Sequence, residues 1–176
     1  RRFGKTMLMN MFESFLNINY EKPGDTSIQD KFFKGTKILE DQKFCKKYMG
    51  QFPVISITLK DVLGDDFESA YLKLAEVVSA KANEFSFLKE SPYLNEMEKA
   101  KFNLLCDEIY LKKADKQAIS YVTSAIKSLS LMLYKHFNKQ VYILIDEYDV
   151  PLAKAQEHGY HKDMVTLMSS FLGFFK

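Results

Sequence analysis

The pattern of apolar residues predicts an α/β fold. Two short apolar runs rich in β-branched residues, 53–59 and 141–145, have the composition of strands. Segments with apolar residues at helical spacing precede, separate and follow these runs. Strands that alternate with helices usually pair in parallel through helical crossovers, so we expect two neighbouring parallel strands with a helical insertion between them.

The first helix is predicted to begin at Lys5. Apolar residues recur at spacings of three and four along 5–16, which is the period of an α-helix. The polar stretch 17–33 contains a Pro-Gly-Asp sequence and is predicted to be a loop. A short helix over about 40–49 is expected to lead into the first strand.

The insertion between the strands is predicted to hold three helices. The first ends near Phe85 and begins where Asp65 and Glu68 form a capping-box pattern. The second covers about 94–110, and the third covers about 116–137. Further residues expected to cap these helices or to be buried by them are Met97, Leu104, Leu105, Asp115, Ile119, Val122, Ile126, Leu129 and Leu133.

The second strand ends at the residues with the clearest functional signal. Residues 141–145 are apolar at every position, so this strand is predicted to be buried on both faces. It stops at Asp146 and Glu147, which are followed by Tyr148 and Asp149. Ligands of open α/β sheets bind outside the carboxyl ends of the strands, so the first two carboxylates are candidate site residues.

Beyond the second strand, Pro151 is predicted to begin an irregular segment that includes Gly159. A last amphipathic helix is predicted over about 161–174. The sequence starts without a methionine and ends inside this amphipathic stretch, so we expect it to be part of a longer protein.

The overall composition gives no electrostatic argument for nucleic acid or an acidic membrane as a partner. Its 25 basic and 23 acidic residues leave a net charge of +2 over 176 residues. No apolar run approaches the roughly 20 residues of a membrane-spanning helix, and no signal-peptide pattern is present. The two cysteines, Cys45 and Cys106, are isolated in the sequence, which is typical of a reducing compartment, so we expect a cytoplasmic protein.

Gly4-Lys5-Thr6 at the start of the first helix has the form of the second half of a phosphate-binding loop, GxxxxGK[ST]. Glycine lets the backbone approach a phosphate, and the free N–H groups of the first helical turn bind anions. Lysine adds a positive charge for the β- and γ-phosphates, and the Thr6 hydroxyl can bind Mg²⁺. The alternative is an ordinary helix N-terminus.

Asp146 and Glu147 match the Walker B pattern of the same class of site. The aspartate would hold Mg²⁺ and the glutamate would polarise the water that attacks the γ-phosphate. The alternative is a pair of solvated carboxylates at the end of a strand. If both motifs belong to one nucleotide site, Lys5 and Thr6 should face Asp146 and Glu147 in the folded chain.

Three segments together resemble one family. They are RRFGKT, FPVISITLKD and VYILIDEYDVPL, and in this order they are similar to the AAA-ATPase-like domain of bacterial and archaeal proteins that often carry a C-terminal PD-(D/E)xK nuclease-like domain. The resemblance implies a three-layer P-loop NTPase fold of the additional-strand type, here truncated at both ends. Residues 1–176 would then be a partial domain that lacks the strand before the P-loop and the C-terminal strands.

The resemblance also implies roles for individual residues. Nucleotide would be bound by Arg2, Phe3, Gly4, Lys5 and Thr6. Mg²⁺ would be bound by Thr6 and Asp146, and the catalytic residues would be Glu147 and Lys5.

The function implied is Mg²⁺-dependent ATP binding and hydrolysis, which drives a conformational change in a larger protein with a C-terminal effector domain. The fragment alone is expected to be inactive. The alternative is a regulatory or scaffold module that binds nucleotide without significant turnover. A small-molecule kinase would require a lid of basic residues, which the sequence does not contain, and no E-x-K sequence of a nuclease site is present.

Overall fold

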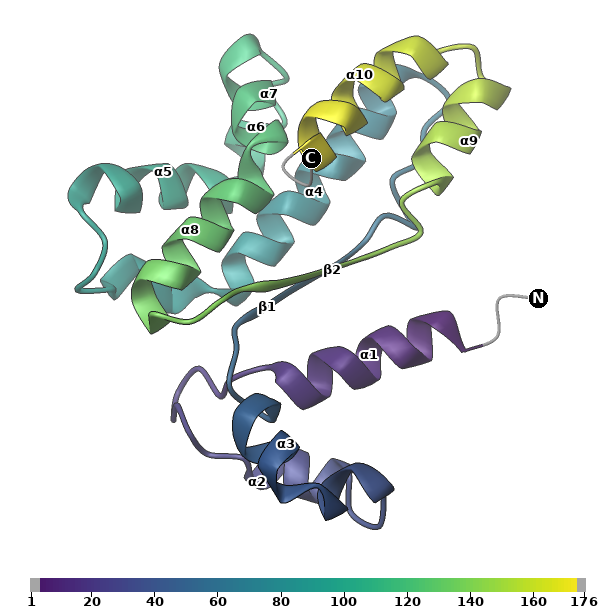
Figure 1. Cartoon of the computed structure of the whole chain (residues 1–176). Helices are drawn as coiled ribbons and strands as arrows, with labels where there is room; N and C mark the ends of the chain where they lie inside the picture. The colour runs from purple at the N-terminus through teal and green to yellow at the C-terminus, as the bar shows by residue number, and fades with distance from the viewer. Residues whose placement is uncertain (1–3, 174–176) are drawn as a thin grey trace.

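Two parallel strands lie at the centre of the chain (Figure 1). In the computed structural model, which describes residues 4–173, β1 (Val54–Thr58) pairs with β2 (Tyr142–Asp146). Val54 lies opposite Tyr142, and Thr58 lies opposite Asp146, so both strands end at the same edge. The predicted parallel pairing of the two strands is confirmed, and the mostly helical arrangement is compatible with an α/β fold.

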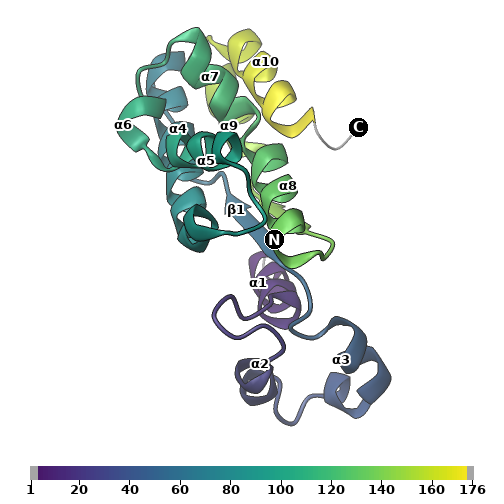
Figure 2. The same cartoon turned by 90° about the vertical axis from the view of Figure 1, so that its left-hand side faces the viewer.

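Helices cover both faces of this small sheet. Figures 1 and 2 show α1, α2 and α3 on one side of the strands and the helices from α4 to α10 on the other. The strand side chains alternate between the two sides. Ile55 and Ile57 belong to a large hydrophobic cluster with the later helices, whereas Val54 belongs to a small cluster with the first helices. On β2, Ile143 packs against the large cluster and Leu144 packs against the small one.

The first side of the sheet is formed by α1 (Lys5–Leu16), α2 (Ser27–Phe32), a 3₁₀ turn (Lys37–Glu40) and α3 (Gln42–Tyr48). The predicted first helix is confirmed, and the helix expected over 40–49 corresponds to α3. The loop expected over 17–33 is wrong in its last part, because α2 forms there.

The other side begins with α4 (Phe67–Glu84), which is followed by a 3₁₀ turn (Ser86–Glu90). The predicted cap of α4 is wrong by one residue. The Asp66 carboxylate, not that of Asp65, accepts a hydrogen bond from the backbone N–H of Ser69 at 2.8 Å.

The expected helix over 94–110 is two helices, α5 (Glu96–Cys106) and α6 (Glu108–Leu111). Asp107 separates them, because it has an extended backbone and its side chain caps α6 through the N–H of Tyr110. The predicted burial of Met97 is wrong, since this residue is 83% exposed, whereas Leu105 is fully buried.

The expected helix over 116–137 is also divided, into α7 (Lys116–Thr123) and α8 (Ala125–Phe137). The hydroxyls of Thr123 and Ser124 donate to backbone carbonyls of the preceding turn at 2.9 and 2.8 Å. Such bonds compete with the regular backbone pattern and bend helices. The predicted cap at Asp115 is confirmed, since its carboxylate accepts from the N–H of Ala118.

The segment after β2 is helical, not irregular as predicted. It forms α9 (Val150–Glu157), which packs against α10 (His161–Leu172). Pro151 does not prevent this helix because it lies in the first turn, where its missing N–H would have no helical partner. Phe174, the expected end of the last helix, lies outside the described residues.

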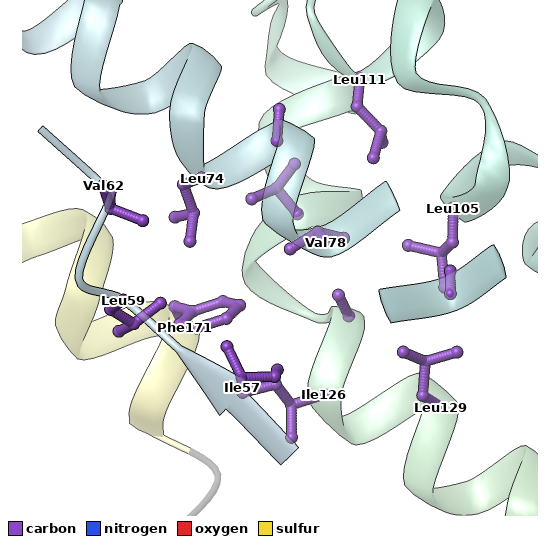
Figure 3. Packing of buried hydrophobic residues seen from close by; sticks show 14 of the residues in the cluster. Ile57, Leu59, Val62, Leu74, Val78, Leu105, Leu111, Ile126, Leu129 and Phe171 are labelled. Atoms are coloured by element: carbon purple, nitrogen blue, oxygen red, sulfur yellow. The ribbon is translucent and has the colours of Figure 1, made fainter. Parts of the chain in front are cut away.

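The large cluster joins β1 to the helices on its side (Figure 3). Ile57 and Leu59 pack there with Ile126, Leu129 and Phe171, and all five side chains are buried.

The burial predicted for both faces of β2 is wrong, because the four residues before Asp146 are only half-buried. In the described part of the chain β2 has a strand neighbour at one edge only.

None of the helices within residues 4–173 combines the length and the apolar composition that crossing a membrane requires.

Gly64 lies at a close approach between the β1–α4 connection and the start of α4. A Cβ atom at this position would lie 2.5 Å from the backbone nitrogen of Ala70. The Gly64 carbonyl also accepts the hydroxyl hydrogen bond of Tyr160, at 2.7 Å, which joins this connection to the α9–α10 turn.

We therefore expect Gly64→Ala to lower the free energy of unfolding by about 1–3 kcal/mol, because the backbone must move to relieve the contact. Urea denaturation measures this difference. Gly173→Ala is the matched control, since its added Cβ would meet none of the described atoms within 4 Å. Equal stability of the two variants would contradict the prediction.

Candidate functional site

The N-terminus of α1 lies beside the carboxyl ends of the two strands, on the right of Figure 1. Gly4 precedes the helix with a left-handed backbone, φ +107°, and its carbonyl accepts the first helical hydrogen bond, from the N–H of Leu8 at 2.8 Å. Side-chain-bearing residues rarely adopt this φ, so the local conformation requires glycine. In the described part of the chain no side chain caps α1.

The first turn of α1 reaches β2 directly. The Thr6 hydroxyl donates a hydrogen bond of 2.7 Å to Asp146 Oδ2, across 140 residues of sequence. Lys5 Nζ lies 3.5 Å from Asp146 Oδ1. The two predicted halves of the site therefore meet at the carboxylate of Asp146, and the expected proximity of Lys5 and Thr6 to this residue is confirmed.

Asp146 is buried, with 5% of its surface exposed, and is ionised at neutral pH. The Thr6 hydrogen bond is the main cause that lowers the pKa of its carboxyl; the backbone N–H of Glu147 and the charge of Lys5 add to it, and burial opposes them. The folded protein thus binds this proton less tightly than the unfolded chain. The stabilisation is present above the unfolded pKa and is lost as the pH falls through the folded one.

The charges at the start of α1 are the reverse of what a helix by itself prefers. The positive end of the helix dipole favours acidic residues, but the first turn has none and begins with Lys5. Asp146 offsets the resulting repulsion from outside the helix. A helix start that has a lysine and, among the described residues, no capping side chain is suited to binding an anion.

Glu147 has a left-handed backbone, with φ +54°, although it is not glycine. Its N–H donates to Asp146 Oδ1 at 3.0 Å, and its carbonyl accepts from the N–H of Val150 at 3.1 Å, so the chain turns sharply after β2. This backbone region costs a residue with a Cβ about 1–2 kcal/mol. Strain of this kind gathers at functional sites.

The predicted site residues differ in what the structure says of them. Gly4, Lys5, Thr6 and Asp146 come together, with Glu147 next in the chain. Arg2 and Phe3 lie outside the described residues. All the predicted roles in binding nucleotide and metal and in catalysis stay predictions.

The sequence indicates that Tyr148 lies next to the acidic pair, but it does not predict the contact of this ring with Lys5. Lys5 Nζ lies 5.8 Å from the centroid of its ring, within the range of a cation–π interaction. The only signal in the sequence was the position of Tyr148 directly after the acidic pair.

The donor atoms at the site fit Mg²⁺. Thr6 Oγ1 and Asp146 Oδ2 are hard oxygen ligands that already lie next to each other. Within residues 4–173 no group of three or more His, Cys, Asp or Glu is placed to hold a metal ion. Mg²⁺ usually takes one or two protein ligands and completes its shell with water and phosphate oxygens.

Comparison with known proteins identifies a family. A family model described as a predicted AAA-ATPase matches residues 1–176, so the family expected from the sequence motifs is confirmed. No curated protein and no solved structure matches the chain significantly.

Removal of the Thr6 hydroxyl should raise the pKa of Asp146 towards its ordinary value of 3.8, because this hydrogen bond is the largest cause of the shift. We expect Thr6→Ala to have a larger effect than Lys5→Met. Titration of the Asp146 carboxyl carbon by NMR measures both changes.

Thr26→Ala is the control for this titration. It removes a hydroxyl that donates to a different carboxylate, that of Asp30, at 3.1 Å, and should leave Asp146 unchanged. A larger shift in Lys5→Met than in Thr6→Ala would contradict the prediction.

Proposed function

The chain belongs to the AAA-ATPase-like family, and from this membership and the site geometry we propose that it binds MgATP and hydrolyses the bond between the β- and γ-phosphates. The single observation that carries the proposal is the hydrogen bond from Thr6 to Asp146. Two sequence motifs that have separate ordinary explanations, a helix start and a strand end, meet at one carboxylate.

The start of α1 would bind the phosphates. Gly4 leaves the approach to the helix open, since a Cβ there would meet no described atom within 4 Å. The N–H groups of the first turn would donate to phosphate oxygens, and Lys5 would move from Asp146 to the β- and γ-phosphates. The 56% exposure of the Lys5 side chain gives it room for this movement.

Thr6 and Asp146 would hold Mg²⁺ through their oxygens. When bound, the ion supplies positive charge that neutralises the phosphates. Asp146 is suited to this role because its lowered pKa keeps the carboxylate ionised.

Glu147 would act as the general base. It follows the metal ligand directly and would accept a proton from the attacking water. The chain turns away from the direction of β2 at Glu147, where the backbone is left-handed. Lys5 would stabilise the negative charge that develops on the phosphates.

The finer features of the proposal follow from the family resemblance. The described strands and helices would be part of a three-layer P-loop fold of the additional-strand type. Hydrolysis would drive a conformational change that acts on a C-terminal effector domain, nuclease-like in many relatives, in a cytoplasmic protein. The second candidate is a module that binds nucleotide without turnover.

We expect Lys5→Ala to weaken MgATP binding about 10- to 100-fold, because it removes a charged hydrogen-bond donor from the phosphates. Glu147→Gln should keep MgATP binding and lower the rate of hydrolysis about 10²- to 10⁴-fold, because the amide cannot accept the proton. Calorimetric titration measures binding, and single-turnover release of phosphate by the full-length protein measures hydrolysis.

Lys127→Ala and Glu90→Gln are matched controls on exposed residues outside the site, and neither should change binding or turnover. If wild type and Glu147→Gln bind MgATP and hydrolyse it equally slowly, the second candidate function replaces the first. If Lys5→Ala binds MgATP as tightly as wild type, both candidates are wrong.

A further inference from the structure

Tyr148 lies where the turn after β2 meets the start of α1. It follows Glu147, and the residue is 53% exposed, so burial in the core does not explain its position. On one side the ring centroid is 5.8 Å from the Lys5 ammonium. Tyr148 is therefore the one aromatic residue, among those the structure describes, with a cation–π contact to this site.

A mostly apolar surface lies next to Tyr148. With α9 and α10 it lines an open hollow of about 310 Å³, whose other apolar side chains are Leu152, Val165, Met168 and Leu172. A side chain with two rotatable bonds that rests beside such a surface loses little entropy on being fixed. The ring can therefore serve as a fixed partner for a mobile cation.

A partner of this kind would restrict the conformations of the Lys5 side chain. Its side chain is 56% exposed and has several rotatable bonds, so alone it would occupy many conformations. Lys5 Nζ also lies 3.5 Å from Asp146, which the proposed function assigns to Mg²⁺. An ammonium that settled fully on Asp146 would compete with the metal for the same oxygens.

We propose that Tyr148 is a positioning residue whose ring holds the Lys5 ammonium at the mouth of the site, so that Asp146 stays available to Mg²⁺. This inference rests on the proposed function. The ring attracts the cation through its negative face, which does not involve the phenolic hydroxyl. Phenylalanine should therefore replace tyrosine, and leucine should not.

The test compares MgATP binding in wild type, Tyr148→Phe and Tyr148→Leu by calorimetric titration. Loss of the ring should raise Kd about two- to fivefold, which is the range of an exposed cation–π contact. The Mg²⁺ concentration that gives half-maximal ATP binding should rise as well, because Lys5 then competes for Asp146. Tyr148→Phe should resemble wild type in both measurements.

Tyr134→Leu is the matched control, because Tyr134 on α8 is 52% exposed and lies outside the site. It should change neither Kd nor the Mg²⁺ dependence. A variant that also carries Lys5→Met tests whether the ring acts through the lysine. In that background Tyr148→Leu should have no further effect on MgATP binding.

The inference is wrong if Tyr148→Leu binds MgATP as tightly as wild type or more tightly, or if Tyr148→Phe binds it as weakly as Tyr148→Leu does. It is also wrong if Tyr134→Leu weakens MgATP binding equally, or if Tyr148→Leu still weakens it in the Lys5→Met background. A different result would show that the proposed function itself is wrong. It would appear as unchanged MgATP binding in Lys5→Met alone.

Discussion

The hydrogen bond from Thr6 to Asp146 links the first helix to the second strand and defines the site. It forms because β1 and β2 pair in parallel and end together, which places Asp146 beside Thr58 at one edge of the sheet. The backbone supports the same position, since the Asp146 carbonyl accepts from the N–H of Leu59 at 3.0 Å. The carboxylate is thus held by a sheet on one side and by a helix start on the other.

The sequence predicted the elements whose signal is local. β-Branched runs identify both strands, and the apolar periodicity identifies α1, α4 and α10. The predictions of helix boundaries are wrong where a hydrogen bond of one side chain determines whether a helix continues or ends. Asp107 and Ser124 each interrupt a periodicity that continues on both sides, and composition does not show which carbonyl or N–H their side chains will bind. The irregular segment predicted after Pro151 is wrong because proline, which ends helices in their interior, is favoured in the first turn of a helix.

For the site, the residue types and their order predicted that Lys5, Thr6 and Asp146 would meet. The left-handed backbone of Glu147 could not be predicted, because it is imposed by the turn into α9 and contradicts the preference of the residue. The contact of Tyr148 with Lys5 depends on the rotation of α1 against the end of β2, which no short-range pattern encodes. The half-exposure of β2 also depends on its neighbours, not on its own composition.

The two hydrophobic clusters on either side of the sheet differ greatly in size, and α1 belongs to the smaller one. Of its residues only Phe15 and Leu16, at the end far from the site, are buried. The N-terminal end of α1 is therefore the part of the helix with the least protection against local unfolding. A ligand that binds there adds its own free energy to the folded form, so occupancy of the site and order in the first turns of α1 are thermodynamically linked.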